Sequence, residues 1–552
     1  MLRENSLLLL LVALILTTGC SKNTSNLSEN SSKAPLFEKL GNHTYNISTK
    51  SELAQRYFNQ GLNLTHGFNH AEAGRSFKEA ARIDKNCAMC YWGAAYVLGP
   101  NINAPMEESS VIEAYGLIQK AIEKSKKGTE KEKDLINALS KRYSSKPVED
   151  RSFLDLEYAS AMRMLTKKYP DDEEILSLFA ESLLDLHPWN YWRSDGNPHP
   201  WTPEILETLE KALQINENHP LANHLYIHAV EASPNPAKGI PSAERLGDLV
   251  PDAGHLVHMP SHIYIRVGRY NDASIANKKA IESDESYVSQ CHAQGVYPLA
   301  YKPHNIHFLW ASSTLEGKSD VAIKSAWDLA GEVDKEMMIK PGLETLQHFY
   351  ITPLYAMVKF GKWEDILKQP LPAENLVYPR GVWDYAMGMA YLRTKQMKRA
   401  KSHLQSLINI SSDPNLENIK IWDSNKTSDL LKIATHMLKA EIAESEGNYK
   451  KALKNLYLAK DIEDSLNYSE PHDWFSPVTL TLGDVLLKAG IPKEAEKIYI
   501  ENLRRYPENG WALYGLYKSL KAQKKYTEAK AVKSRFDRVW ENSDITLTAS
   551  RL

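Results

Sequence analysis

Histidines concentrate in one stretch of this 552-residue chain. Nine of the 18 lie between His219 and His307. Many recur at spacings of three and four residues, which place side chains on one face of an α-helix. The histidines that follow this spacing are His224, His228, His255, His258, His262, His304 and His307. Glu231, three residues after His228, and the later His348 complete the set of candidate ligands.

These residue types favour a transition-metal site. Protonated imidazoles gathered on one surface repel each other, whereas neutral imidazole is a common metal ligand. At three or four donors per ion, the nine candidates divide among two or three ions, and the sequence leaves the number open. An imidazole-rich shell favours copper or zinc, and Glu231 keeps iron open. Metal-activated water attacking an ester or amide, and copper–oxygen chemistry, are both compatible reactions, so enzymatic activity stays undecided.

Two other hypotheses fit the same histidines. In the first, the protein is an interaction scaffold whose groove histidines bind a peptide or an envelope protein. It can also be a pH sensor whose histidines become charged near pH 6. His66, His219 and His292 are weaker metal-ligand candidates.

A repeated pattern of small and aromatic residues indicates the elements that must position the histidines. Its two clearest copies are Gly61, Ala73, Phe77, Ala80 and Gly483, Ala495, Tyr499, Pro507. Both resemble the 34-residue tetratricopeptide (TPR) repeat, in which small residues let two antiparallel helices approach and the aromatic fills their seam. We therefore predict an all-α superhelix, or solenoid, of helix pairs. Aromatic and Pro-rich insertions, such as residues 187–192, interrupt it.

The TPR frame places the histidines at equivalent positions. In four successive repeats they fall at positions 2, 5 and 9 of the first helix, with Glu231 at position 12. The resemblance implies that these positions line the concave groove where TPR proteins bind ligands. The expected partner is consequently a small molecule or a peptide in that groove.

The first residues read as an export signal. Arg3 precedes an apolar run over residues 7–16, which is too short to span a membrane. Residues 16–20 resemble a bacterial lipobox, which implies cleavage before Cys20 and lipid attachment to it. The expected location is the cell envelope, on the outer membrane facing the periplasm, with the lipid anchor as the only membrane contact.

The expected organisation has four parts. Residues 1–19 form the signal peptide, and residues 20–50 form the lipidated cysteine and a flexible tether. Residues 51–350 form an N-terminal TPR region with the His-rich groove, and residues 351–552 form a C-terminal TPR region.

Charge and cysteine content narrow the function classes. The formal net charge is −2, and no nucleic-acid-binding motif occurs, so we expect no nucleic-acid partner. Cys87 and Cys90 have the CxxC spacing, but no thioredoxin-like strand pattern surrounds them, so we predict a small structural disulfide.

Three longer segments resemble those of a group of bacterial TPR lipoproteins. The shared motifs are GHLxHMPSHIY, PHNxHF and NGWALYGL, which stand here at residues 254–264, 303–308 and 509–516. The resemblance implies the TPR fold for nearly the whole body and brings no reaction with it.

Overall fold

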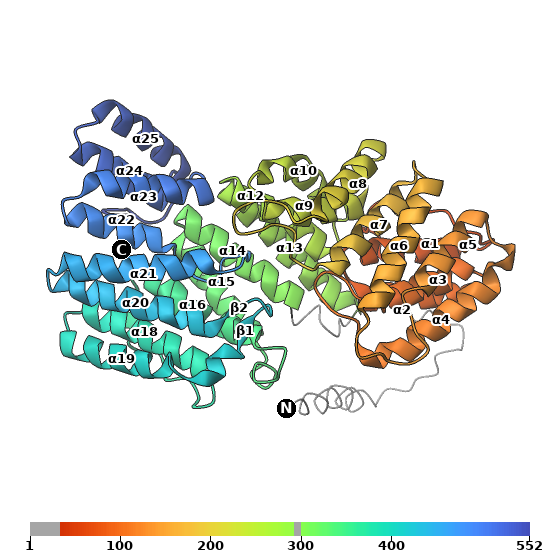
Figure 1. Cartoon of the computed structure of the whole chain (residues 1–552), viewed down its shortest axis with the longest axis horizontal. Coiled ribbons are helices and arrows are strands. Elements are labelled where there is room, and N and C mark those ends of the chain that lie inside the picture. Colours follow the sequence, from red (N-terminus) through yellow and green to blue (C-terminus); the bar gives the residue numbers. More distant parts are fainter. Residues whose placement is uncertain (1–33, 292–299) are drawn as a thin grey trace.

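The computed structural model describes residues 34–291 and 300–552, and the side chains of residues 286–291 are excluded from that description. The predicted signal peptide, Cys20 and His292 lie outside the described residues. The described chain is a TPR-like superhelix of helix pairs, as the sequence predicted (Figure 1). Its one short hairpin pairs β1 (Lys420–Ile421) with β2 (Asn425–Lys426).

The helices follow one another along the length of the molecule (Figure 1). In the first part they are α1 (Glu52–His66), α2 (His70–Ile83), α3 (Ala88–Tyr96), α4 (Val111–Lys124), α5 (Glu130–Ser140), α6 (Ser152–Lys168), α7 (Glu173–Leu186), α8 (Thr202–Ile215), α9 (Pro220–Glu231), α10 (Ile240–Leu249), α11 (Gly254–His258), α12 (Pro260–Arg266) and α13 (Tyr270–Cys291). In the second part they are α14 (Lys302–Glu316), α15 (Ser319–Glu332), α16 (Thr345–Lys359), α17 (Trp363–Ile366), α18 (Val377–Arg393), α19 (Met397–Ile410), α20 (Thr427–Ser445), α21 (Tyr449–Ser465), α22 (Val478–Lys488), α23 (Pro492–Arg505), α24 (Gly510–Ala522) and α25 (Tyr526–Val539). Short 3-10 turns cover Glu108–Ser110, Ser125–Lys127, Pro236–Gly239 and Pro414–Glu417.

The small and aromatic residues of the repeat pattern form the seams between helices. A Cβ placed on Gly61 or Gly93 would lie 2.7 or 2.5 Å from the ring of Phe77. A Cβ on Gly483 or Gly515 would likewise lie 2.4 or 2.2 Å from the ring of Tyr499. Since each aromatic ring occupies the space left by two glycines, the pattern has the physical role expected of a TPR seam.

The buried apolar side chains form two main clusters that meet along α14. One runs from Leu40 to Phe308 and the other from Trp310 to Leu547. The predicted boundary at residue 350 instead falls inside α16. Helices α1–α7 and α18–α25 lie at opposite ends of the molecule, with α9–α13 between them (Figure 1).

Residues 34–50 lie against the helical body, which differs from the flexible tether expected over residues 20–50. Leu40 is buried, and the backbone N–H of Phe37 donates to Gln60 Oε1 over 2.9 Å. The hydroxyl of Tyr57 donates to the carbonyl of Ala34 over 3.0 Å. Polar composition suggested a tether, but backbone hydrogen bonds to α1 fix this segment.

Four helical segments carry the predicted ligands. Helix α9 bears His224, His228 and Glu231; α11 and α12 bear His255, His258 and His262; α14 bears His304 and His307; and α16 bears His348. Met259, which keeps helical backbone angles, joins α11 to α12, and Pro260 begins α12, where its missing N–H is not needed in a first helical turn. Among the described residues, no helix is both long and apolar enough to cross a membrane.

Candidate metal centre

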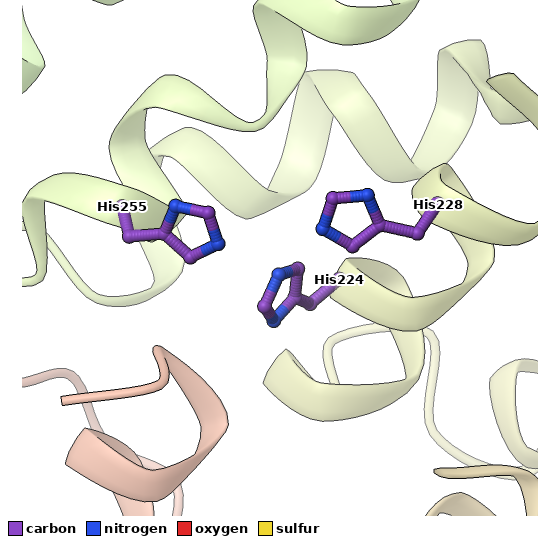
Figure 2. Close-up of side chains that lie close together, drawn as sticks. All are labelled: His224, His228 and His255. Atoms are coloured by element: carbon purple, nitrogen blue, oxygen red, sulfur yellow. The ribbon is translucent and has the colours of Figure 1, made fainter. Parts of the chain in front are cut away.

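The first histidine trio consists of His224 and His228 from α9 and His255 from α11. A ring nitrogen of each lies within 4.8 Å of one in each of the others. Figure 2 shows the three rings facing a common space from two helices. The ring of Phe68 backs the trio, with its centroid 4.5 Å from that of His224 and 5.7 Å from that of His255.

The second trio consists of His258 from α11, His262 from α12 and His304 from α14. Its ring nitrogens also lie within 4.8 Å of one another. Phe308 backs this trio, with ring centroids 4.5–4.9 Å from all three imidazoles. The two trios are adjacent, since the ring centroids of His228 and His262 are 5.3 Å apart.

Hydrogen bonds fix the orientation of four of these six rings through the Nδ1 atom. Nδ1 of His224 lies 2.7 Å from the carbonyl oxygen of His66, and Nδ1 of His258 lies 2.7 Å from Asn277 Oδ1. The amide of Asn277 is itself oriented, because its Nδ2 donates to the carbonyl of Ala273. As these oxygens only accept, each Nδ1 carries the proton and each Nε2 presents a lone pair.

Glu231 performs the same task for one ring of each trio. Its Oε1 lies 2.7 Å from His228 Nδ1, and its Oε2 lies 2.6 Å from His262 Nδ1. Burial alone would raise the pKa of Glu231, but His262 and His228 beside it lower that pKa below its usual value. The ionised carboxylate therefore accepts from both rings and leaves their Nε2 atoms available.

The second trio brings two of these lone pairs together. His258 Nε2 and His262 Nε2 lie 2.9 Å apart, and both rings have their proton on Nδ1. Two lone pairs at this distance repel unless a cation, either a proton or a metal ion, lies between them. In the first trio, Nε2 of both His224 and His228 is buried and has no hydrogen-bond partner in the described part of the chain.

Burial favours the neutral form of five of the six imidazoles. It lowers the pKa values of His224, His255, His258 and His304 well below the usual value, and the neighbouring histidines lower them further. Burial also lowers the pKa of His228, although the neighbouring Glu231 opposes this shift. Neutral, buried and oriented imidazoles are the form that binds a metal.

The remaining two predicted ligands, His307 and His348, form a separate pair. Their ring centroids are 5.6 Å apart, and neither belongs to a trio. His348 Nδ1 lies 2.9 Å from the hydroxyl of Tyr378, and the ring of His307 stacks on Trp310. The repeat frame put them in the first helices of successive repeats, and they lie on α14 and α16. The structure supplies no third His, Cys, Asp or Glu donor to the pair among the described residues.

A second histidine cluster surrounds Glu174 at the start of α7. The Nε2 atoms of His43, His66 and His219 lie 3.0, 3.1 and 3.0 Å from its two carboxylate oxygens. His219 Nδ1 accepts the backbone N–H of Ala222, so its proton is on Nε2 and points at the carboxylate. This carboxylate is thus satisfied without an ion, which contrasts with the two trios.

Sequence reasoning missed this cluster because its members come from unrelated positions. His66 and His219 were weak candidates, and neither His43 nor Glu174 shares a helix with them. The cluster nevertheless supports the first trio, since the carbonyl of His66 is the acceptor that orients His224. Long-range packing of the segment before α1, of α1 and of α7 against the start of α9 brings these residues together.

An irregular segment over residues 466–477, between α21 and α22, closes the outer side of Glu231. The hydroxyl of Tyr468 lies 3.1 Å from Glu231 Oε2 and 2.9 Å from Glu470 Oε1. Arg266 donates to the carbonyl of Glu231 over 2.9 Å, which caps the end of α9, and its guanidinium lies over the ring of Tyr468. Residues more than 200 positions away in the sequence thus hold the carboxylate that orients both trios.

The insertions and the cysteines also have defined places. Trp189, in the insertion after α7, meets the ring of His228 edge-on with centroids 5.0 Å apart, and it is 47% exposed. Trp189 therefore lies between the first trio and solvent.

Cys87 and Cys90 form a disulfide at the start of α3.

Acidification of the metal-free protein is expected to reduce its stability. Burial lowers the pKa values of His66 and His70 to about 4, so below about pH 6.5 the unfolded chain binds protons that the folded chain excludes. Each such histidine costs about 1.4 kcal/mol per pH unit between these limits. We expect the urea midpoint of chelator-treated protein to fall from pH 6.5 to pH 4.5, and less steeply in His70→Gln. A constant midpoint would contradict neutral buried histidines.

Comparison with known proteins leaves the chain without a family. No family model and no curated protein matches it. Among solved structures, human IFIT1 in a dimer with m7Gppp-AAAA shares 14% identity at a TM-score of 0.31, over 89% of this chain and 91% of that one. The APC/C hetero-tetramer Cut9-Hcn1 shares 14% identity at a TM-score of 0.28, over 89% and 74% of the two chains. Such distant neighbours say nothing about what this chain binds.

Proposed function

We propose that this protein binds two transition-metal ions, one in each histidine trio. His224, His228 and His255 hold the first ion, and His258, His262 and His304 hold the second. The observation that carries this proposal is the orientation of the rings: four of the six rings have Nδ1 bonded to a fixed acceptor, which leaves each Nε2 lone pair free to bind an ion. Such outer hydrogen bonds are typical of histidine ligands.

Glu231 has an orienting role in this account, which differs from the direct ligand expected from its helical spacing. Both of its oxygens accept Nδ1 protons, one from each trio. Glu231 lies on the Nδ1 side of the two rings, so it would have to give up both Nδ1 hydrogen bonds to reach an ion bound by their Nε2 atoms. Glu231 therefore couples the geometries of the two sites.

The donor set favours copper or zinc. Copper and zinc suit a site of three imidazoles in which no thiolate or carboxylate contacts the ion. Iron is less favoured, because Glu231 bonds the histidine rings and is not a ligand of the ion. Three protein ligands also leave a coordination position open. A bound ion there supplies Lewis acidity or an activated water, and a small molecule or peptide is the partner that would use it.

Metal content tests the proposal. Untagged protein, supplemented in turn with copper, zinc and iron and then dialysed, is expected to retain about two ions per chain, since each trio offers a three-donor site. Elemental analysis provides the count. Loss of all metal on dialysis against weakly chelating buffer would favour the alternative, an interaction scaffold whose histidines contact a peptide or envelope protein.

We also propose that the protein is exported and lipidated at Cys20, as the apolar run and lipobox-like residues indicate. The Cys87–Cys90 disulfide supports an oxidising compartment. Expression with a radiolabelled fatty acid is expected to label the wild type and not Cys20→Ala, because the thiol is the attachment site. Equal labelling of Cys87→Ala and wild type is the control, and labelling of Cys20→Ala would contradict the proposal.

A further inference from the structure

A small cavity lies at the junction of the two apolar clusters, apart from the histidine trios. Its volume is about 40 Å³, and it is lined by α12, α14, α16, α22 and the segment 466–477. Aromatic side chains form much of the wall, among them Trp310, Trp474, Phe475 and Tyr506. Lys359, at the end of α16, also lines it.

Lys359 is buried without a carboxylate partner. It is 7% exposed, and among the described residues no acidic oxygen lies within 4.0 Å of its Nζ. Nζ donates to Ser476 Oγ over 3.1 Å and lies 3.8 Å from the ring centroid of Trp511. An ammonium group has three N–H donors, so this hydrogen bond uses one of them. Buried charges are ordinarily paired, which makes an unpaired lysine at a cavity wall an indication of a missing anion.

Other polar atoms of the wall also lack partners within the described chain. The indole Nε1 atoms of Trp310 and Trp474 and Oε2 of Glu470 are buried and make no hydrogen bond. Most buried polar groups are satisfied by protein, water or ligand. Residues that line the cavity thus carry an ammonium group and two unpaired indole N–H donors, which suit an occupant that accepts hydrogen bonds.

The charge of the wall near pH 6 is set by Lys359. Burial lowers its pKa to about 7, so it is mainly charged at pH 6. Burial raises the pKa of Glu470 to about 7, so this carboxyl group is mainly neutral there. His472 is neutral because burial holds its pKa well below the usual value, and Tyr506 is neutral because burial raises its pKa.

We propose that this cavity binds a small carboxylate, with Lys359 as its counter-ion and the indoles of Trp310 and Trp474 as hydrogen-bond donors. One buried water needs a cavity volume of roughly 10–15 Å³. The cavity of about 40 Å³ therefore fits about three waters or one acetate-sized ion. The cavity shares no lining residue with the histidine trios, although Tyr468 links its Glu470 to Glu231. Neither proposal depends on the other.

Acetate and its neutral isostere acetamide test this site at pH 6. Saturation-transfer NMR on the methyl signal, at constant ionic strength in chloride buffer, is expected to show saturable binding of acetate and none of acetamide. Lys359→Met is expected to weaken acetate binding about tenfold or more, since a hydrogen bond to a charged group contributes a factor of roughly ten to a hundred. Lys362→Met, an exposed lysine just beyond the same helix, is the matched control and should bind as the wild type does.

Trp474→Phe keeps the ring and removes one donor, so it provides a second readout if Lys359→Met fails to fold. It is expected to weaken acetate binding several-fold. Three results would overturn the proposal: no acetate binding to the wild type, equal binding of acetamide, or unchanged binding in both cavity variants. Water alone would then fill the cavity.

Discussion

His258→Asn is expected to remove one of two bound metal ions and leave the other. The substitution deletes an Nε2 donor from the second trio, where His258 and His262 approach to 2.9 Å, and leaves the first trio with all three imidazoles. His224→Asn should produce the mirror result at the first site. Elemental analysis after dialysis, with metal affinity from competition against a chelator, measures both effects.

The control for these variants is His436→Asn. His436 is a partly buried histidine on α20 that bonds Asn455 and belongs to neither trio. It should retain both ions. If His258→Asn and His224→Asn each kept the wild-type metal content, the assignment of ligands would be wrong. If either lost both ions, the two sites would not bind independently.

Glu231→Ala is expected to weaken both metal sites and to destabilise the fold. The change leaves Nδ1–H of His228 and Nδ1–H of His262 without their buried acceptor, whereas the hydroxyl of Tyr468 keeps Glu470 Oε1 as its acceptor. Removing an outer carboxylate typically costs 10–100-fold in metal affinity. Each buried N–H left without its acceptor costs about 1–3 kcal/mol of folding free energy, which urea unfolding with and without chelator would measure.

Glu217→Ala provides the comparison for Glu231→Ala. Glu217 is an exposed carboxylate that pairs with Arg245 on the surface, so its loss should change the free energy of unfolding by no more than about 0.5 kcal/mol. A loss of affinity at only one site in Glu231→Ala would argue against a shared orienting carboxylate. Complete loss of metal with unchanged stability would argue that Glu231 is a direct ligand.

The fold followed from local patterns in the sequence. Glycines at positions 61 and 483 with aromatic residues 16 positions later identified the helix pairs, because the seam needs a small residue opposite a ring. The spacing of His255, His258 and His262 indicated a helix, and they lie in the consecutive helices α11 and α12. These inferences succeeded because helical periodicity is a short-range property.

The grouping of the ligands could not be read from spacing. His255 and His258 lie three residues apart on α11, yet they belong to different trios, because each faces a different neighbouring helix. The role of Glu231 depends on which ring atoms it contacts, and that depends on how α9 packs against α12. Tyr468 contacts Glu231, and His43 contacts Glu174, only through packing between residues far apart in the sequence.

Anomalous diffraction from crystals of the metal-loaded protein, recorded at the absorption edge of the bound metal, locates the ions relative to the histidine trios. We expect two anomalous peaks, one about 2.0–2.1 Å from Nε2 of His224 and of His228 and from a ring nitrogen of His255, and the other at the same distances from Nε2 of His258 and of His262 and from a ring nitrogen of His304. Glu231 should remain bonded to Nδ1 atoms and lie outside both coordination shells. Peaks located elsewhere, or a single ion bound directly by the carboxylate of Glu231, would contradict this expectation.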